Sequence, residues 1–365
     1  MFTRRLIRFV CASFALCNMS AQAAERWQTV ELHHADTPYH LALYANHDLA
    51  GRLDAISDIV IVVHGIQRNA NDYYATASAL LKRSGRNAAD VLLIAPKFTT
   101  APDVAKGFQA MPVWNAQGWP AGDTAIAGAG TGISSFTALD DLLQTLLQTG
   151  RMPALKRITI AGHSAGAQFV QRYAVLNGYD EAIRARGIGL QYVVANPSSF
   201  LYLNAERPLA QKNGFAPYDS TLCPDYNRYR YGPEQLPAYA EMRDADALWR
   251  RYLQRQVAYL AGSADKDPNH PLLDKSCAAE AQGESRLVRA HHYWDNEWRQ
   301  TGQTPQTHSY NEVNGVAHQQ GKMFGSACGV RLLFGDDASA GSDAAACTPV
   351  QPTPPMRLNS LHDAH

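Results

Sequence analysis

Short runs of consecutive apolar, β-branched residues recur along the chain and predict a buried parallel sheet. The clearest is Asp58-Ile-Val-Ile-Val-Val63, in which five apolar residues follow one another. Strands of parallel sheets are covered on both faces, so they read as continuous apolar runs rather than as alternating patterns. Strands are also predicted at 91–95, 158–161, 191–195, 252–260 and, as the last one, 308–313. A hairpin of strands 27–32 and 40–44, with Thr37-Pro38 at its turn, precedes them.

Segments with helical spacing separate these runs. Helices are predicted from about Asn71 to Arg83 and from about Ser134 to Gln148, and the residues after Gly166 also favour a helix. Strands that alternate with helices predict an α/β domain with a doubly wound, mostly parallel sheet and helices on both faces. Right-handed crossovers bring the loops after the strands to one edge of such a sheet, so a site is expected at that edge.

Three segments depart from the alternation. Residues 96–133 are rich in Gly, Ala and Pro and predict a long loop. Residues 200–250 are rich in Tyr, Pro and Arg and predict an inserted, cap-like segment over the strand ends. The predicted organisation is a signal peptide at 1–23, the α/β domain at 24–335, and an Ala/Ser/Pro-rich tail at 336–365 that is ordered only near Cys347.

Charge and the N-terminal pattern narrow the class of protein. Among 365 residues, 33 Lys and Arg balance 33 Asp and Glu, and no basic cluster stands out, which argues against nucleic acid or an anionic membrane as a partner. The basic segment 1–8, the short apolar segment 9–16 and Ala21-Gln22-Ala23 form a signal-peptide pattern, with cleavage near Ala23. The apolar segment is too short to span a membrane. We therefore expect export to the periplasm or the extracellular space.

Four cysteines follow the predicted signal peptide. An even number in an oxidising compartment predicts two disulfides, for which three connectivities exist. Nearness in sequence favours Cys223–Cys277 and Cys328–Cys347, and buried free thiols are the alternative. Since no C-x-x-C pair exists, a zinc ribbon or a thioredoxin-like site is excluded.

The segment "ITIAGHSAGAQFV" (158–170) places a serine between a predicted strand and a predicted helix. Gly162-His163-Ser164-Ala165-Gly166 matches the G-x-S-x-G nucleophile elbow. Small residues flank the serine because a strained turn and a closely packed helix leave little room for side chains. A tight turn with an incidental serine is the alternative, and the test is whether suitable partners follow.

Partners follow in the required order. A serine nucleophile needs a base and an acid that orients the base, and in this kind of fold the acid precedes the histidine. Asp265 lies three residues after the strand that ends at Gly262, and His318 follows the last predicted strand. Asp267 competes with Asp265 for the role of the acid.

Other readings of these polar residues are weaker. Asp265-x-Asp267-x-Asn269 resembles the start of a calcium loop, but His270 and Ser276 stand where glycine and glutamate are needed. The pair His291-His292 lacks the i, i+4 spacing of a helical zinc site, and packing or surface exposure is expected. His64 is expected to brace the following loop by hydrogen bonds.

Backbone amides after two strands are candidates for an oxyanion hole. The amide of Ala165, at the start of the predicted helix, follows the nucleophile directly, and the helix dipole there favours an anion. The second donor is expected in "HGIQRNAND", from Ile66 or Gln67.

With these residues the sequence resembles a secreted, esterase-like serine hydrolase of the α/β-hydrolase superfamily. The resemblance rests on "VVHGIQRNANDYY", "GHSAG", "LAGSADKDP" and "NGVAH" and covers about residues 59–324. It implies catalysis by Ser164, Asp265 and His318 with no metal and no cofactor. The loop His-Gly-Ile-Gln differs from the glycine-rich loop of many lipases, so a lipase for bulky acyl groups is not implied.

The expected substrate is a small-molecule or polymer-derived carboxylic ester, cleaved through an acyl-enzyme. Trp114, Trp119 and Tyr202 are candidate substrate-binding residues, with packing of the insertion as the alternative. Further aromatic and basic candidates are Tyr226, Tyr229, Tyr231, Arg228 and Arg230. A peptidase or amidase on the same fold and a non-catalytic binding protein are the competing functions. A His318 pKa near 6.5, or raised by the carboxylate, would make activity rise through neutral pH.

Overall fold

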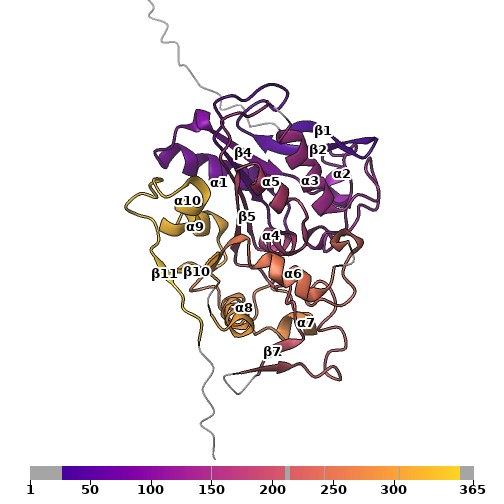
Figure 1. Ribbon diagram of the computed structural model, residues 1–365, viewed down its shortest axis with the longest axis vertical. Helices are drawn as coiled ribbons and strands as arrows, with labels where there is room; N and C mark the ends of the chain where they lie inside the picture. Colours follow the sequence, from indigo (N-terminus) through magenta and orange to yellow (C-terminus); the bar gives the residue numbers. More distant parts are fainter. Residues whose placement is uncertain (1–26, 149, 210–213, 242, 304, 354–365) are drawn as a thin grey trace, which may run out of the picture.

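A twisted sheet runs through the centre of the computed structural model, which describes residues 27–353 apart from 149, 210–213, 242 and 304 (Figure 1). The predicted signal peptide lies outside the described residues. In these residues the sheet has nine strands in the order β1-β2-β4-β3-β5-β6-β9-β10-β11. The strands from β4 to β10 pair in parallel, whereas β1, β2 and β11 pair antiparallel at the edges. The strand bounds are β1 Gln28–His34, β2 Thr37–Ala45, β3 Asp58–Val63, β4 Val91–Pro96, β5 Arg157–His163, β6 Gly189–Ala195, β9 Gln256–Gly262, β10 His308–Val313 and β11 Cys347–Pro349.

Helices cover both faces of the sheet because the apolar side chains of each central strand point alternately to either side. In β3, Ile59, Ile61 and Val63 join the core under α3, α4 and α8, whereas Val60 and Val62 join the core under α1, α9 and α10. In Figure 1 the sheet separates α1, α9 and α10 from α3 and α4. The helix bounds are α1 Ala70–Arg83, α2 Ala101–Val104, α3 Ser135–Leu146, α4 Ala165–Leu176, α5 Asp180–Ala185, α6 Ala245–Tyr252, α7 Cys277–Glu280, α8 Arg286–Thr301, α9 Gln320–Phe324 and α10 Ala327–Phe334.

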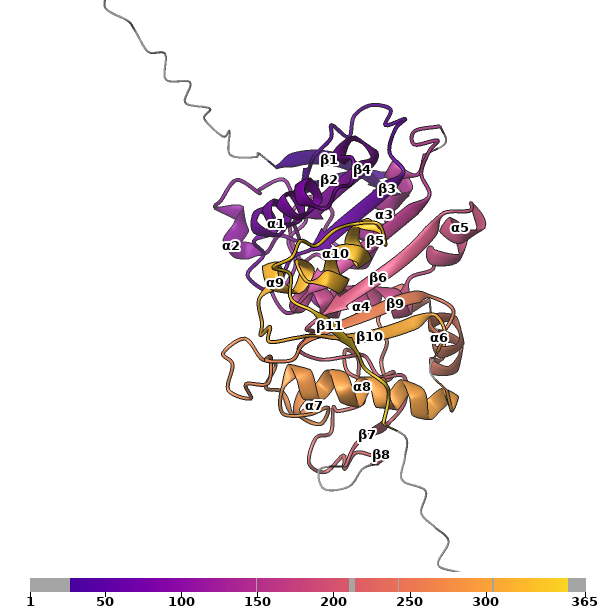
Figure 2. The ribbon, with the colours of Figure 1, turned by 90° about the vertical axis from the view of Figure 1, so that its left-hand side faces the viewer.

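The predicted insertion at 200–250 contains the small hairpin β7 (Glu206–Pro208) and β8 (Phe215–Pro217) and continues into α6. Figure 2 shows the hairpin at the end of the molecule that carries α7 and α8. Both favoured disulfides are present, Cys223–Cys277 and Cys328–Cys347, each with an S–S distance of 2.02 Å. The first ties the insertion to α7, and the second ties α10 to β11.

Several predicted boundaries are wrong. The hairpin turn lies at Ala35-Asp36, because Thr37 already pairs with His34 in the ladder. The strand predicted from Tyr252 begins only at Gln256, and Tyr252 ends α6. The strand 308–313 is not the last one, since β11 pairs with it. Short apolar runs do not distinguish the end of a helix from the start of a strand, and a three-residue edge strand carries almost no pattern.

Candidate active site

Ser164 lies at the sharp turn between β5 and α4. Its backbone has φ of +61° and ψ of −122°, a strained conformation for a residue with a side chain. A Cβ atom on Gly162 would lie 2.1 Å from the carbonyl oxygen of Gly166, and one on Gly166 would lie 2.2 Å from the carbonyl oxygen of Val63. Both glycines are therefore required by close backbone approach, which is the reason for the G-x-S-x-G spacing.

Hydrogen bonds join Ser164, His318 and Asp265 into one chain. The distance from His318 Nε2 to Ser164 Oγ is 2.9 Å, and that from His318 Nδ1 to Asp265 Oδ2 is 2.7 Å. With the imidazole neutral, the serine hydroxyl donates to Nε2 and Nδ1–H donates to the carboxylate. The three residues come from the ends of β5, β9 and β10, so the parallel sheet brings together side chains that are far apart in the sequence.

Two buried residues that were not singled out in the sequence hold Asp265 in place. Asn196, at the end of β6, donates from Nδ2 to Asp265 Oδ2 at 2.8 Å, and its Oδ1 accepts the amide of Gly262 at 2.8 Å. Arg286 of α8 lies 3.4 Å from the other carboxylate oxygen. The φ of Asn196 is +49°, a conformation that asparagine tolerates better than most residues. The only sequence signal is its position after a strand.

The pKa values of the buried pair follow from burial and from charge. Burial alone would raise the pKa of Asp265, but the hydrogen bond from His318 and the charges of His318 and Arg286 hold it below its usual range. For His318, burial lowers the pKa below 6.5, the hydrogen bond to Asp265 opposes this, and the positive charge of Arg286 adds to the lowering. The structure thus corrects the expectation that the His318 pKa stays near 6.5 or rises.

The alternative candidates Asp267, His291 and His292 do not belong to the hydrogen-bonded chain of Ser164, His318 and Asp265. The exposed Asp267 accepts the amide of Asn269 at 2.8 Å. His291 and His292 lie on α8, where His291 pairs with Glu312. No group of three or more His, Cys, Asp or Glu residues in the described part of the chain is arranged to hold a metal ion.

The loop after β3 is held from two sides. His64 is fully buried, its Nδ1 lies 2.9 Å from the carbonyl oxygen of Gly65, and its Nε2 accepts the amide of Phe98 at 3.1 Å. Arg68 donates to the carbonyl of Ile66 at 2.9 Å and to Asp103 at 2.8 Å. Ile66 and Ala165 both line the cavity beside Ser164, and Gln67 lines a neighbouring one. Ala165 is the first residue of α4, where backbone amides have no partner within the helix.

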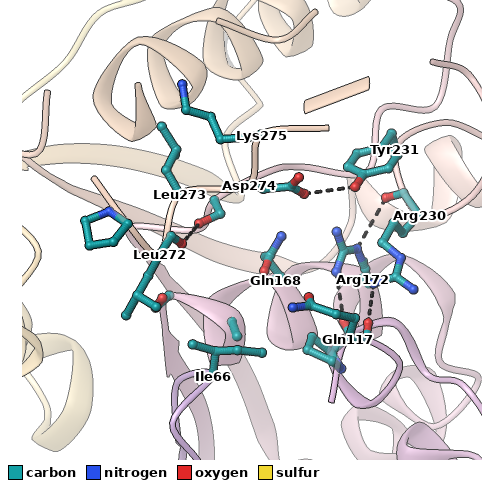
Figure 3. A pocket seen from close by; sticks show the side chains of 15 residues that line it. Ile66, Gln117, Gln168, Arg172, Arg230, Tyr231, Leu272, Leu273, Asp274 and Lys275 are labelled. Carbon is teal, nitrogen blue, oxygen red and sulfur yellow. Dashed lines mark hydrogen bonds between the residues drawn. The ribbon is translucent and has the colours of Figure 1, made fainter. Parts of the chain in front are cut away.

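Two cavities meet at Ser164. The larger, of about 520 Å³, is shown in Figure 3, and its walls come from α4, from the insertion and from the segment 271–275. The smaller, of about 220 Å³, is lined by His318, His270 and Gln67 among others. Ile66, Ser164 and Leu272 belong to both linings.

The three predicted substrate-binding aromatics line neither cavity, which corrects that prediction. Trp114, Trp119 and Tyr202 are at most 1% exposed. Trp119 stacks on Phe98 at 5.3 Å, and Tyr202 packs edge-on against Tyr293 at 5.1 Å. Large aromatic side chains are more strongly stabilised by burial than by lining an open cleft. Of the other candidates, Tyr231 and Arg230 do line the larger cavity.

The sheet order, the flanking helices and the elbow define this chain as a protein of the α/β-hydrolase fold. Two solved structures are similar over most of their length. One is LpqC, a poly(3-hydroxybutyrate) depolymerase from Bordetella parapertussis, with a TM-score of 0.56, 22% identity, and coverage of 85% of this chain and 94% of that one. The other is poly(aspartic acid) hydrolase-1 from Sphingomonas sp. KT-1, with a TM-score of 0.56, 20% identity, and coverage of 85% and 98%. No protein-family model matches the sequence, and neither does any curated protein.

Proposed function

We propose that the chain is an exported serine hydrolase that cleaves carboxylic esters through an acyl-enzyme. The observation that carries the proposal is the hydrogen-bonded chain from Ser164 through His318 to Asp265. His318 takes the hydroxyl proton as Ser164 attacks the ester carbonyl, and Asp265 keeps the imidazole in the productive tautomer. His318 then gives that proton to the departing alcohol, and water activated by His318 releases the acid.

The negative oxygen of the tetrahedral intermediate is assigned to the backbone amides of Ala165 and of Ile66 or Gln67. One such donor contributes roughly 3 kcal/mol to lowering the barrier. The bonds from Arg68 and His64 support this assignment because they hold the loop after β3 without using the amide of Ile66.

Export is supported by the signal-peptide pattern in the sequence and by the two disulfides, which persist in oxidising compartments. In the described residues, no helix is both long and apolar enough to cross a membrane.

The proposal includes the type of bond that is cleaved, an ester rather than an amide, and an assay can test it. The two structural neighbours are named for a polyester and for a polymer of aspartic acid, so their names do not select between an ester and an amide. We therefore propose hydrolysis of 4-nitrophenyl esters from acetate to decanoate as the first assay, with Ser164→Ala alongside the native chain. The expected result is a loss of about 10⁴-fold or more in the variant.

Labelling by a serine-directed fluorophosphonate completes the test. Labelling with turnover of a 4-nitroanilide but of no ester would indicate an amidase. Absence of both labelling and turnover would indicate a non-catalytic binding protein. Equal rates in the native chain and in Ser164→Ala would refute Ser164 as the nucleophile.

A further inference from the structure

The two cavities that meet at Ser164 have different relations to the catalytic base. His318 lines the smaller cavity and is absent from the lining of the larger one. The departing alcohol must lie next to His318, which protonates it. The smaller cavity therefore faces the alcohol, and the larger cavity receives the acyl group.

One wall of the acyl cavity is a single face of α4. Ser164, Gln168 and Arg172 are spaced by four residues and line the cavity in succession. Positions i, i+4 and i+8 lie on the same side of a helix and span about 12 Å along its axis. Figure 3 shows Gln168 and Arg172 directed from the helix into this space. Arg172 therefore lies towards the end of the cavity that is remote from Ser164.

Arg172 is a buried cation that has no ion-pair partner within 4.0 Å among the described residues. Its side chain is fully buried, and it donates to the carbonyl oxygens of Pro120 (3.0 Å) and Arg230 (3.3 Å) and to Ser199 Oγ (3.2 Å). Among the described residues, no carboxylate lies within 4.0 Å of it, whereas the buried Arg286 has Asp265 at 3.4 Å. Three of the five N–H groups of a guanidinium are used in this way. Burial lowers the pKa of Arg172 to about 10, so it stays charged at neutral pH.

No carboxylate of the lining pairs directly with this charge, although the negative charge of Asp274 acts on Arg172 from beyond 4.0 Å. Arg230 and Lys275 add two more cations, whereas Asp274 is the carboxylate among the lining residues. The Asp274 carboxylate accepts hydrogen bonds from Tyr231 (2.9 Å) and from Ser276. Arg230 forms an ion pair with Asp123 at 3.8 Å, and Lys275 forms one with Glu280 at 3.3 Å, and both pairs are partly exposed. Arg172 is therefore the cation of the lining that remains available to a ligand. A buried charge is costly until it is paired.

We propose that the larger cavity binds acyl groups that end in a carboxylate, and that Arg172 is the specificity-determining residue that pairs with it. The preferred substrates are then monoesters of dicarboxylic acids, cleaved at the ester end. This rests on the proposed function of Ser164. A guanidinium and a carboxylate form charge-assisted hydrogen bonds, and one N–H group on each of Nη1 and Nη2 of Arg172 remains unused.

The test compares mono-4-nitrophenyl adipate with 4-nitrophenyl hexanoate, which has the same number of acyl carbons and no carboxylate. The measured quantity is the ratio of kcat/KM for the two esters. We expect a ratio above about 10 in the native chain, a drop of at least tenfold in Arg172→Met, and partial recovery in Arg172→Lys. Arg255→Met is the matched control, since Arg255 is equally buried, lines neither cavity and bonds to no lining residue, and its ratio should equal that of the native chain.

A second measurement needs no change at Arg172 and decides the matter if those variants do not fold. Free adipate should inhibit hexanoate hydrolysis competitively in the native chain, more weakly at high salt, whereas 1,6-hexanediol should not. A kcat/KM ratio of one or less in the native chain would overturn the proposed role of Arg172, and so would inhibition by adipate that is no stronger than inhibition by the diol. In either case, hexanoate turnover that requires Ser164 would still support the proposed function. If Ser164→Ala hydrolyses both esters at the native rate, the proposed function itself fails.

Discussion

At the scale of single residues, the environment of His318 is set by three groups, two of which follow strands and one of which lies on a helix. Asp265 and Asn196 act through hydrogen bonds, and Arg286 acts through charge. Burial and Arg286 together outweigh the effect of the carboxylate on the imidazole. The His318 imidazole is therefore neutral at lower pH than a solvated histidine.

The pH profile follows from this direction. Because burial lowers the pKa of His318 below 6.5, kcat/KM should rise with pH to a midpoint below 6.5 and be flat at pH 7 to 8. Removing a positive charge next to the imidazole should raise its pKa, so Arg286→Gln should move the midpoint upward. The measurement is kcat/KM for 4-nitrophenyl acetate from pH 4.5 to 8, with the exposed Arg52→Gln as control. A native midpoint above 6.5 would contradict the expectation.

Asn196 is expected to act as a positioning residue. Asn196→Ala removes the hydrogen bond to Asp265 and leaves the amide of Gly262 without its acceptor, so kcat should fall by about 10- to 100-fold. Asn177→Ala is the control, because Asn177 is also buried and hydrogen-bonded but lies at the end of α4. Thermal unfolding should show a loss of stability in both variants, and equal losses of kcat would argue for a merely structural role of Asn196.

At the scale of elements, the contact between α4 and the strand loops leaves no room for a side chain at Gly166. In Gly166→Ala the new Cβ would collide with the carbonyl oxygens of Val63 and His64, which belong to backbone and cannot rotate away. We expect a loss of about 3 kcal/mol in the free energy of unfolding, with activity lost because Ser164 moves. Gly189→Ala is the control, since its nearest atom would lie at 3.6 Å. Urea unfolding of both variants gives the comparison.

Much of this arrangement could be predicted from the sequence, because the buried parallel strands leave a strong pattern. β3 begins and ends at the predicted residues, and Ser164, Asp265 and His318 were all placed after strands. The helix α8 was missed because its sequence is rich in Arg, His and Trp and has few aliphatic residues. The roles of Asn196, Arg286 and Arg172 depend on which atoms lie opposite them, and a chain position does not reveal that.

At the scale of the whole molecule, the two disulfides fasten different parts. Cys223–Cys277 closes a separation of 54 residues and Cys328–Cys347 one of 19. In the chain-entropy model the longer loop contributes about 1 kcal/mol more stability. Replacing both cysteines of one pair by serine should therefore lower the unfolding free energy more for 223/277 than for 328/347. Chemical denaturation of the two double variants measures this, and the reverse order would contradict the entropic account.

The disulfide Cys223–Cys277 has a consequence for how the sequence of the protein can vary. The walls of the larger cavity at 230–231 and 271–275 lie outside the strands and are joined to each other by Cys223–Cys277 and by the hydrogen bond from Tyr231 to Asp274. Ser164, Asp265 and His318 instead follow β5, β9 and β10. The segments 218–241 and 271–280, which exclude β9 and Asp265, can thus vary together between related chains and change the acid that the larger cavity accepts, while Ser164, Asp265 and His318 stay in place.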